Sequence, residues 1–232
     1  MAPSLLDAPV MPMREAARQL RIPASTLQHW LEGGERRNTS YPPVLRPKAR
    51  GTLEMTWGEV VEARYLRAYR TRTSMQRLRP FISTMREELR VPYPLAHFQP
   101  FVTTNRELVF QLQQRTDLPD DLWLVLRGST GQYRLNPLLV GDYLHLVDFA
   151  EDGHQEAERI SPLGKERAVV IDPRITSGAA TVRGIRTAVL AERERAGAPV
   201  EELADEFGLP EADVRDGLAF EWSTQWPAET VA

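Results

Sequence analysis

Three uncharged hydrogen-bonding side chains near the amino end lie at the spacing of one helical face. Ser25, Gln28 and His29 occupy positions i, i+3 and i+4 of a short amphipathic segment, and Thr26 is their neighbour. Such side chains can donate hydrogen bonds to base edges in the major groove of DNA or accept hydrogen bonds from them. The pattern therefore predicts a surface that reads DNA sequence.

A helix-turn-helix is the arrangement that would position these side chains, because its second helix lies in the major groove. Residues 13–20 and 24–31 each carry apolar residues at helical spacing, and Pro23 suits the start of the second helix. Arg14 and Arg18, on the first helix, join the predicted DNA-binding set. The expected core faces are Met13, Ala16, Ala17 and Leu20 on the first helix and Ala24, Leu27, Trp30 and Leu31 on the second. The competing interpretation is an ordinary helical hairpin.

A basic loop follows the second helix. Residues 41–45 and 53–55 are expected to be two short extended pieces, so that the loop between them forms a wing. Cations of a wing contact phosphates, which adds salt-dependent affinity but little sequence information. The basic residues assigned to these contacts in and before the loop are Arg36, Arg37, Arg46, Lys48 and Arg50.

A third helix is expected next, because Thr56 and Glu59 have capping-box spacing and an amphipathic run extends from there to about Arg70. The order helix, helix, wing, helix resembles the MerR-type winged-helix DNA-binding domain over about the first 70 residues. A fourth helix is expected at about 74–90. Pro80 within it should kink or restart the helix, which argues against a long coiled coil.

The middle of the chain is expected to be rich in β-structure. Strand-like runs are found at residues 108–112, 122–126, 132–135 and 143–149, and residues 156–160 are expected to pair with the last of these as a hairpin. The region also holds His97, His145 and His154, which lack the spacing of metal ligands. No metal site is therefore expected.

The last part of the chain predicts a strand at 168–171 and three short helices. The first helix should be capped by Thr187 and run to Ala196, the second covers residues 200–207, and the third starts near Pro210. This part resembles the domain-of-unknown-function-433 family. The matching residues are Asp172-Pro173, Gly178, Arg183-Gly184, Arg186, Gly197, Glu201-Glu202-Leu203-Ala204, Val214 and Leu218-Ala219-Phe220-Glu221.

The combination of these parts resembles the long VapB-type antitoxins. The resemblance implies two partners, which are a PIN-domain ribonuclease toxin and the operator DNA of the protein's own operon. Two DNA-binding heads are needed for a palindromic operator, so a homodimer is expected. Phe220, Trp222 and Trp226 are predicted to anchor the toxin, because aromatic residues are frequent anchors at interfaces. The alternatives are that Trp222 packs against its own domain and Trp226 is disordered, or that the carboxyl-terminal helical domain forms the dimer contact.

Charge separates the two ends of the chain. Residues 1–90 hold 16 Arg and Lys against 9 Asp and Glu, whereas residues 91–232 hold 13 against 23. The basic amino-terminal part is expected to bind nucleic acid, and the acidic carboxyl-terminal part is expected to bind a second partner with a basic surface. The competing interpretation is that both halves are merely solvated.

Composition bounds the remaining possibilities. The chain has no cysteine, no run of 18 apolar residues and no signal peptide, so we expect a cytoplasmic protein without disulfides or a membrane span. Common catalytic and phosphate-binding motifs are absent, and no enzyme activity or cofactor is expected. The predicted fold is α+β and mainly helical, with a winged helix-turn-helix region at 1–91, a β-rich region at 92–165 and a helical region at 166–232. The alternative function is a stand-alone MerR-like transcription regulator, with a carboxyl-terminal part that senses a ligand or dimerises.

Overall fold

Helix α3 (Trp57–Arg70) is the central helix of the amino-terminal part and also contacts the later five-stranded sheet. The computed structural model describes residues 4–36, 39–70, 74–97, 106–116, 123, 125–127, 132–135, 146–150 and 156–223. The capping box predicted at the start of α3 is confirmed. The Thr56 amide donates to the Glu59 carboxylate at 3.0 Å, and the Glu59 amide donates to Thr56 Oγ1 at 3.4 Å.

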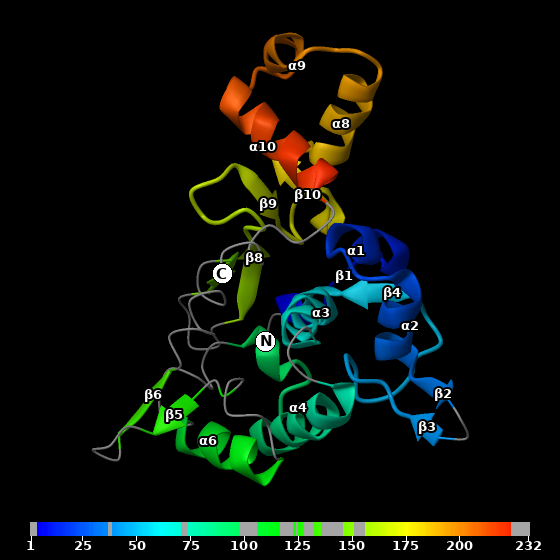
Figure 1. Ribbon diagram of the computed structural model, residues 1–232, viewed down its shortest axis with the longest axis vertical. Helices are drawn as coiled ribbons and strands as arrows, with labels where there is room; N and C mark the ends of the chain where they lie inside the picture. Colours follow the sequence, from blue (N-terminus) through cyan, green and yellow to red (C-terminus); the bar gives the residue numbers. More distant parts are fainter. Residues whose placement is uncertain are drawn as a thin grey trace.

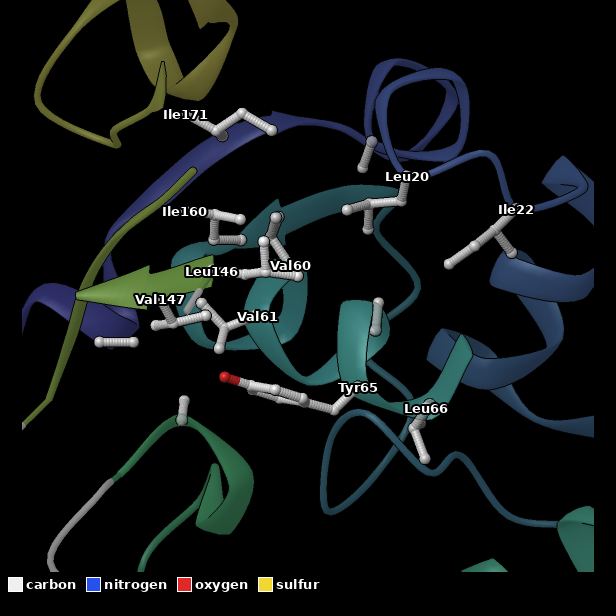
Figure 2. Close-up of a cluster of buried hydrophobic side chains, with 14 of the residues drawn as sticks. Leu20, Ile22, Val60, Val61, Tyr65, Leu66, Leu146, Val147, Ile160 and Ile171 are labelled. Carbon is white, nitrogen blue, oxygen red and sulfur yellow. The ribbon is translucent and has the colours of Figure 1, made fainter. Parts of the chain in front are cut away.

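The apolar residues of α3 meet side chains from both halves of the chain. Figure 2 shows Val60, Val61, Tyr65 and Leu66 within one buried cluster. The other labelled members of that cluster are Leu20, Ile22, Leu146, Val147, Ile160 and Ile171. Glu59, Glu62 and Arg64 of α3 are buried as well, so this helix is enclosed on most of its circumference. The amino-terminal helices and the later sheet are therefore joined through α3 in one core.

The amino-terminal part contains the two helices predicted from periodicity. A 3-10 turn η1 (Leu5–Asp7) and strand β1 (Pro9–Pro12) lead into α1 (Met13–Gln19), and α2 (Ala24–Glu32) follows after a short turn. Seven of the eight residues assigned to the core faces are buried. Ala24 is exposed instead, because it is the first residue of α2 and lies outside the packed turn.

The predicted wing is wrong in its position. The hairpin consists of β2 (Gly34–Arg36) and β3 (Thr39–Tyr41), which pair antiparallel directly after α2. Residues 42–53 contain no strand, because Pro42 and Pro43 follow β3 and proline has no N–H to continue a ladder. The second predicted extended piece is β4 (Glu54–Thr56), which pairs antiparallel with β1 rather than with residues 41–45.

Two further helices and a third two-stranded sheet complete the lower part of the molecule in Figure 1. Helix α4 (Met75–Leu89) confirms the helix expected at 74–90 and runs through Pro80, which lies on its exposed side. A 3-10 turn η2 (Pro94–Ala96) precedes α6 (Arg106–Arg115). Strands β5 (Val125–Arg127) and β6 (Tyr133–Leu135) pair antiparallel.

The strand predicted at residues 108–112 is wrong, because this run lies within helix α6. A short apolar run does not distinguish a strand from a buried helix. The flanking residues are unbranched glutamine, glutamate and arginine, which favour a helix. Val109 and Leu112, three positions apart, are fully buried on one side of α6.

A five-stranded antiparallel sheet joins the middle of the chain to its carboxyl-terminal part. Its strands are β7 (Val147–Phe149), β8 (Ala157–Ile160), β9 (Val169–Ile171), β10 (Ala180–Val182) and β11 (Ile185–Arg186), hydrogen-bonded in the order β11-β10-β9-β8-β7. The predicted pairing of residues 156–160 with the preceding strand is confirmed. Strands β10 and β11 were not predicted. The sheet crosses residue 165, the predicted boundary between two regions.

Three helices follow this sheet. They are α8 (Thr187–Arg195), α9 (Val200–Phe207) and α10 (Glu211–Trp222), and they confirm the three predicted helices. Two of them, α8 and α10, cover the β9–β10 end of the sheet, while α9 packs on those two (Figure 1). Thr187 does not cap α8, because its hydroxyl bonds instead to the Ala180 carbonyl at 3.3 Å and to the Glu221 carboxylate at 2.5 Å. Within the described residues, no helix is long and apolar enough to cross a membrane. The chain is thus mixed α+β and mainly helical, as predicted.

Candidate nucleic-acid interface

The outward face of α2 carries the side chains predicted to read bases. Ser25 and Gln28 are exposed, while Thr26 and His29 are partly buried. The opposite face is fully packed, since Leu27 and Leu31 are inaccessible and Trp30 is 3% exposed. Helix α2 therefore has one face fixed in the core and one polar face toward solvent. That division is what insertion of a helix into a DNA groove requires.

The β2–β3 hairpin lies beside this polar face. The His29 ring meets the Tyr41 ring edge to face, with centroids 5.9 Å apart and planes at 67°. Gly33 permits the close approach, because a Cβ there would lie 2.3 Å from the Tyr41 carbonyl oxygen. Its φ of 72° is also a conformation that glycine adopts without strain. Helix α2 and the hairpin thus form one continuous edge of the molecule (Figure 1).

One predicted phosphate-binding residue, Arg36, belongs to this hairpin. Arg36 is the last residue of β2 and pairs in the ladder with Thr39. Arg37 lies outside the described residues. In the backbone, Arg36 is therefore at the end of β2, the strand that follows α2 in the chain.

Arg46 is not available for DNA, and its assignment to phosphate contact is wrong. Its side chain is fully buried and binds Glu59 through two hydrogen bonds of 2.9 Å. A third nitrogen donates to Glu32 at 2.5 Å and to the Thr52 carbonyl at 3.1 Å. Arg46 therefore ties the end of α2 to the start of α3. The sequence carries no local signal for this burial, because the partners Glu59 and Glu32 lie 13 and 14 residues away.

Arg50 and Lys48, the other two cations of the predicted loop, differ in their contacts. Arg50 is 40% exposed and lies 3.4 Å from both the Glu59 carboxylate and the Tyr93 hydroxyl. Lys48 is exposed and makes no ion pair with any residue that the structure describes. Of the three loop cations, Lys48 is therefore the one best placed to contact a phosphate.

The two arginines of α1 also differ. Arg14 is exposed and without an ion pair in the described part of the chain. Arg18 is bound to Glu15 at 2.7 Å and to Glu221 of α10 at 2.6 Å. The hydrogen bond to Glu15 raises the pKa of the Arg18 guanidinium above its usual value. Arg18 thus joins α1 to the carboxyl-terminal helices, a role that the sequence did not predict.

Two further residues of this junction were not predicted. Gln19 is 1% exposed, and its side-chain oxygen accepts a hydrogen bond from the Ala180 amide at 3.0 Å. Arg21 donates to the Phe220 carbonyl, and its guanidinium lies 4.9 Å from the centre of the Phe220 ring. The predicted DNA-binding head is therefore held against the carboxyl-terminal helices by several polar contacts.

The predicted partner-binding aromatics fall into three cases. Phe220 is fully buried in the core, so its assignment as a partner anchor is wrong. Trp222 is 47% exposed, and its indole N–H donates to Glu194 at 3.0 Å while Arg195 lies 4.8 Å above its ring. Trp226 lies outside the described residues. Trp222 is thus the aromatic residue of α10 that remains accessible.

Helix α9 gives the carboxyl-terminal part an acidic face. Glu201, Glu202, Asp205 and Glu206 are all exposed, while Leu203 faces the core. Glu206 is paired with Arg193 of α8 at 2.8 Å. In the described residues, no group of three or more His, Asp or Glu side chains is arranged to hold a metal ion.

Comparisons with known proteins cover most of the chain. Residues 169–220 match the family described as "Protein of unknown function (DUF433)", in agreement with the resemblance seen in the sequence. The chain is 31% identical to the "Uncharacterized protein Rv2308" of Mycobacterium tuberculosis over 226 residues, which are 94% of this chain and 92% of that protein. It is also 31% identical to the "Putative antitoxin VapB45" of the same organism over 229 residues, 91% of this chain and 93% of that protein.

A solved structure shares the fold. The crystal structure of Rv2018 from Mycobacterium tuberculosis superposes with a TM-score of 0.69 at 27% identity, covering 93% of this chain and 100% of that one. The similarity therefore extends over the amino-terminal helices, the sheet and the carboxyl-terminal helices together.

Proposed function

The chain belongs to the family of VapB45 and Rv2308 of Mycobacterium tuberculosis, and we propose that it is an antitoxin that binds a PIN-domain ribonuclease toxin and its own operator DNA. The name of VapB45 and the family match at residues 169–220 support a role in a toxin–antitoxin pair. In this proposal the chain acts as a binding protein in the cytoplasm and has no catalytic role.

The proposed DNA binding rests on one observation: α2 is buried on one face and exposed on the other. On its polar face Ser25 and Gln28 are exposed and His29 is partly buried, while its apolar face is packed in the core. The adjoining β2–β3 hairpin supplies the wing of a MerR-like head, although it lies earlier in the chain than the sequence predicted. The cations proposed to contact phosphates are Arg14, Arg36, Arg37, Lys48 and, at the edge, Arg50.

The toxin is proposed to bind the carboxyl-terminal helices. A ribonuclease binds an anionic substrate, so its surface includes basic patches that an acidic helix can face. Helix α9 presents four exposed carboxylates, and Trp222 of α10 offers an exposed aromatic ring. These residues and the polar face of α2 lie on different parts of the molecule, so both partners can be held at once (Figure 1).

Two copies of the chain are proposed to act together on a palindromic operator. A two-fold operator is bound by two heads spaced about one helical turn of DNA, or a multiple of it. A nuclease footprint on the DNA upstream of the gene would then show two protected half-sites. A single protected half-site bound by one chain would contradict the dimer.

Co-expression with the product of the neighbouring gene tests the toxin-binding half. We expect the two proteins to co-purify and the toxin's ribonuclease activity to be lost in the complex. A chain that binds the upstream DNA but never the neighbouring protein would instead be a stand-alone regulator. That result would contradict the antitoxin role and leave the DNA-binding role intact.

A further inference from the structure

The turn between α1 and α2 contains a residue in an uncommon backbone conformation. Arg21 has a φ of 56°, in the left-handed region that residues with a Cβ seldom occupy. Such a conformation persists only where the surrounding structure holds it. Because this turn sets the direction of the polar face of α2 relative to α1, whatever holds Arg21 also orients that face.

The last turn of α10 is one of the elements that hold this turn. The Arg21 guanidinium donates to the carbonyl of Phe220, which is 199 residues later in the chain. Arg18, in the last turn of α1, donates to the Glu221 carboxylate at 2.6 Å. Figure 1 shows α1 close to the end of α10. The carboxyl-terminal helices therefore contact the helix-turn-helix at its turn.

Three arginines meet at this turn. Arg67 of α3 donates to the Leu20 carbonyl at 2.6 Å, close to Arg18 and Arg21. Burial lowers the pKa of the Arg21 guanidinium below its usual value. The charges of Arg18 and Arg67 lower this pKa further, whereas the charge of Glu221 raises it. Glu221 thus offsets part of the repulsion among arginines that the fold brings together.

Glu221 has a well-defined position. Its side chain is 5% exposed. One carboxylate oxygen accepts the hydrogen bond from Arg18, and the other accepts a hydrogen bond from the Thr187 hydroxyl at 2.5 Å. Thr187 is the first residue of α8 and is itself buried. Hydrogen bonds to an ionised group are stronger than neutral ones, so these two bonds fix the carboxylate between α1 and α8.

We propose that Glu221 is a positioning residue for sequence-specific DNA binding, although it lies in the carboxyl-terminal part of the chain. Through Arg18, and by offsetting the charge at Arg21, it holds the turn in the conformation that presents the polar face of α2. Hydrogen bonds to base edges depend strongly on geometry, whereas phosphate contacts carry no sequence information. Loss of Glu221 should therefore reduce discrimination between DNA sequences more than it reduces DNA binding in general. This inference rests on the proposed DNA-binding function.

E221Q tests the proposal, with E211Q as the matched control. Both changes remove one carboxylate charge from α10, but Glu211 lies at the other end of the helix and pairs with Arg215 at 2.6 Å. Removing a negative charge should by itself strengthen binding to any DNA. We expect E221Q to lose about tenfold in affinity for the upstream DNA without losing affinity for a scrambled duplex. E211Q should lose affinity for neither duplex.

T187V separates positioning from general stability. Valine has nearly the shape of threonine but lacks the hydroxyl that binds Glu221 from the side of α8. T187V should lower the melting temperature of the protein, because a buried acceptor loses its donor. The ratio of the two DNA affinities should stay within about twofold, because Arg18 and Glu221 remain paired. If T187V lowers this ratio as much as E221Q does, the effect is one of fold stability and the proposal is overturned.

The double variant R21G/E221Q tests for rescue. Glycine adopts a φ of 56° without strain and removes one of the three arginines, so the turn depends less on the charge of Glu221. E221Q should lower the affinity ratio by less than about threefold in the R21G background. Equal effects of E221Q in the two backgrounds would overturn the proposal. The comparison can be made with E221D if E221Q does not fold.

Hydrogen exchange tests the hold on the turn without DNA. The amides of Arg21 and Ile22 donate to α1 carbonyls at 3.3 and 2.9 Å, and in E221Q they should exchange at least about threefold faster. Unaltered exchange at both amides would overturn the proposal. If the unaltered chain does not prefer the upstream DNA, the proposed function fails and this inference fails with it. A preference that E221Q leaves intact overturns this inference alone.

Discussion

Arg46 and Glu59 form a two-pronged ion pair in which neither side chain is exposed to solvent. Both hydrogen bonds measure 2.9 Å, and Glu59 also accepts a hydrogen bond from the Thr56 amide. One carboxylate thus closes the capping box of α3 and neutralises an arginine from the preceding loop. The pair fixes the end of α2, through Glu32, relative to the core helix. The polar face of α2 is oriented by this contact.

Replacing Arg46 by glutamine should therefore destabilise the fold rather than weaken DNA contact directly. Removing one partner of a buried ion pair leaves the other charge uncompensated, which costs about 3–5 kcal/mol. The measurement is the free energy of unfolding from urea denaturation. R50Q is the control, since Arg50 is 40% exposed and its pair with Glu59 should contribute less than about 1 kcal/mol. Equal effects of the two changes would contradict the assignment.

Glu62 should make the stability of the protein depend on pH. Burial raises the pKa of this carboxyl from 4.5 to about 8, although Arg86 and the Leu95 amide counteract the shift. The folded state then holds a proton that the unfolded state releases above pH 4.5. The contribution to stability is therefore complete below pH 4.5 and is lost as the pH rises toward 8.

Thermal unfolding at pH 6 and pH 8 measures this effect. We expect the unaltered chain to melt at a lower temperature at pH 8, and E62Q to show a smaller difference between the two values. The comparison of the two chains removes the contribution of the other titrating groups. A pH dependence that E62Q leaves unchanged would show that Glu62 is ionised in the folded protein.

Lys48 should contribute a phosphate contact that carries no sequence information. In K48Q, affinity for specific and random DNA should fall together, and the slope of log K against log salt should flatten by about 0.9. K165Q is the matched control, because Lys165 is the other lysine of the chain and is paired with Asp148 at 2.6 Å. An unchanged slope in K48Q would show that Lys48 does not contact a DNA phosphate.

Trp222 should anchor the toxin. Truncation of an exposed aromatic anchor at an interface costs on the order of 2 kcal/mol or more, so W222A should weaken toxin binding by more than tenfold. I175A is the control, since Ile175 is an exposed apolar residue of the same part of the chain, at 38%. Calorimetry with the purified toxin would measure both variants. If W222A bound the toxin with full affinity, Trp222 would not be the anchor, and the toxin would contact other residues of α9 or α10.

The sequence predicted the elements whose signals are local. The helices α1, α2 and α3 follow from apolar spacing, from Pro23 and from the capping box of Thr56 and Glu59. The helices α8, α9 and α10 follow from apolar residues separated by Gly197 and Gly208, which have positive φ values of 102° and 63°. Each of these signals is contained within one or two turns of chain.

The features that depend on distant partners could not be predicted in this way. Arg46 is a surface cation by type, and only the positions of Glu32 and Glu59 make its burial favourable. The position of Phe220 near the end of the chain suggested an exposed side chain. In the structure Arg21, 199 residues earlier, covers its ring. Strands β10 and β11 are too short to show alternation, and they form because β10 pairs with β9 on one side and with β11 on the other.

The central claim is that the outward face of α2 reads DNA sequence, and replacing Gln28 and His29 together by alanine tests it most directly. Fluorescence anisotropy with the DNA upstream of the gene and with a scrambled duplex gives the specificity ratio, and Q132A, an exposed glutamine outside this face, is the control. We predict that Q28A/H29A loses affinity for the upstream DNA by about 1–3 kcal/mol for each lost base contact while its affinity for scrambled DNA is unchanged. Equal losses on both duplexes, or no loss on either, would contradict the claim.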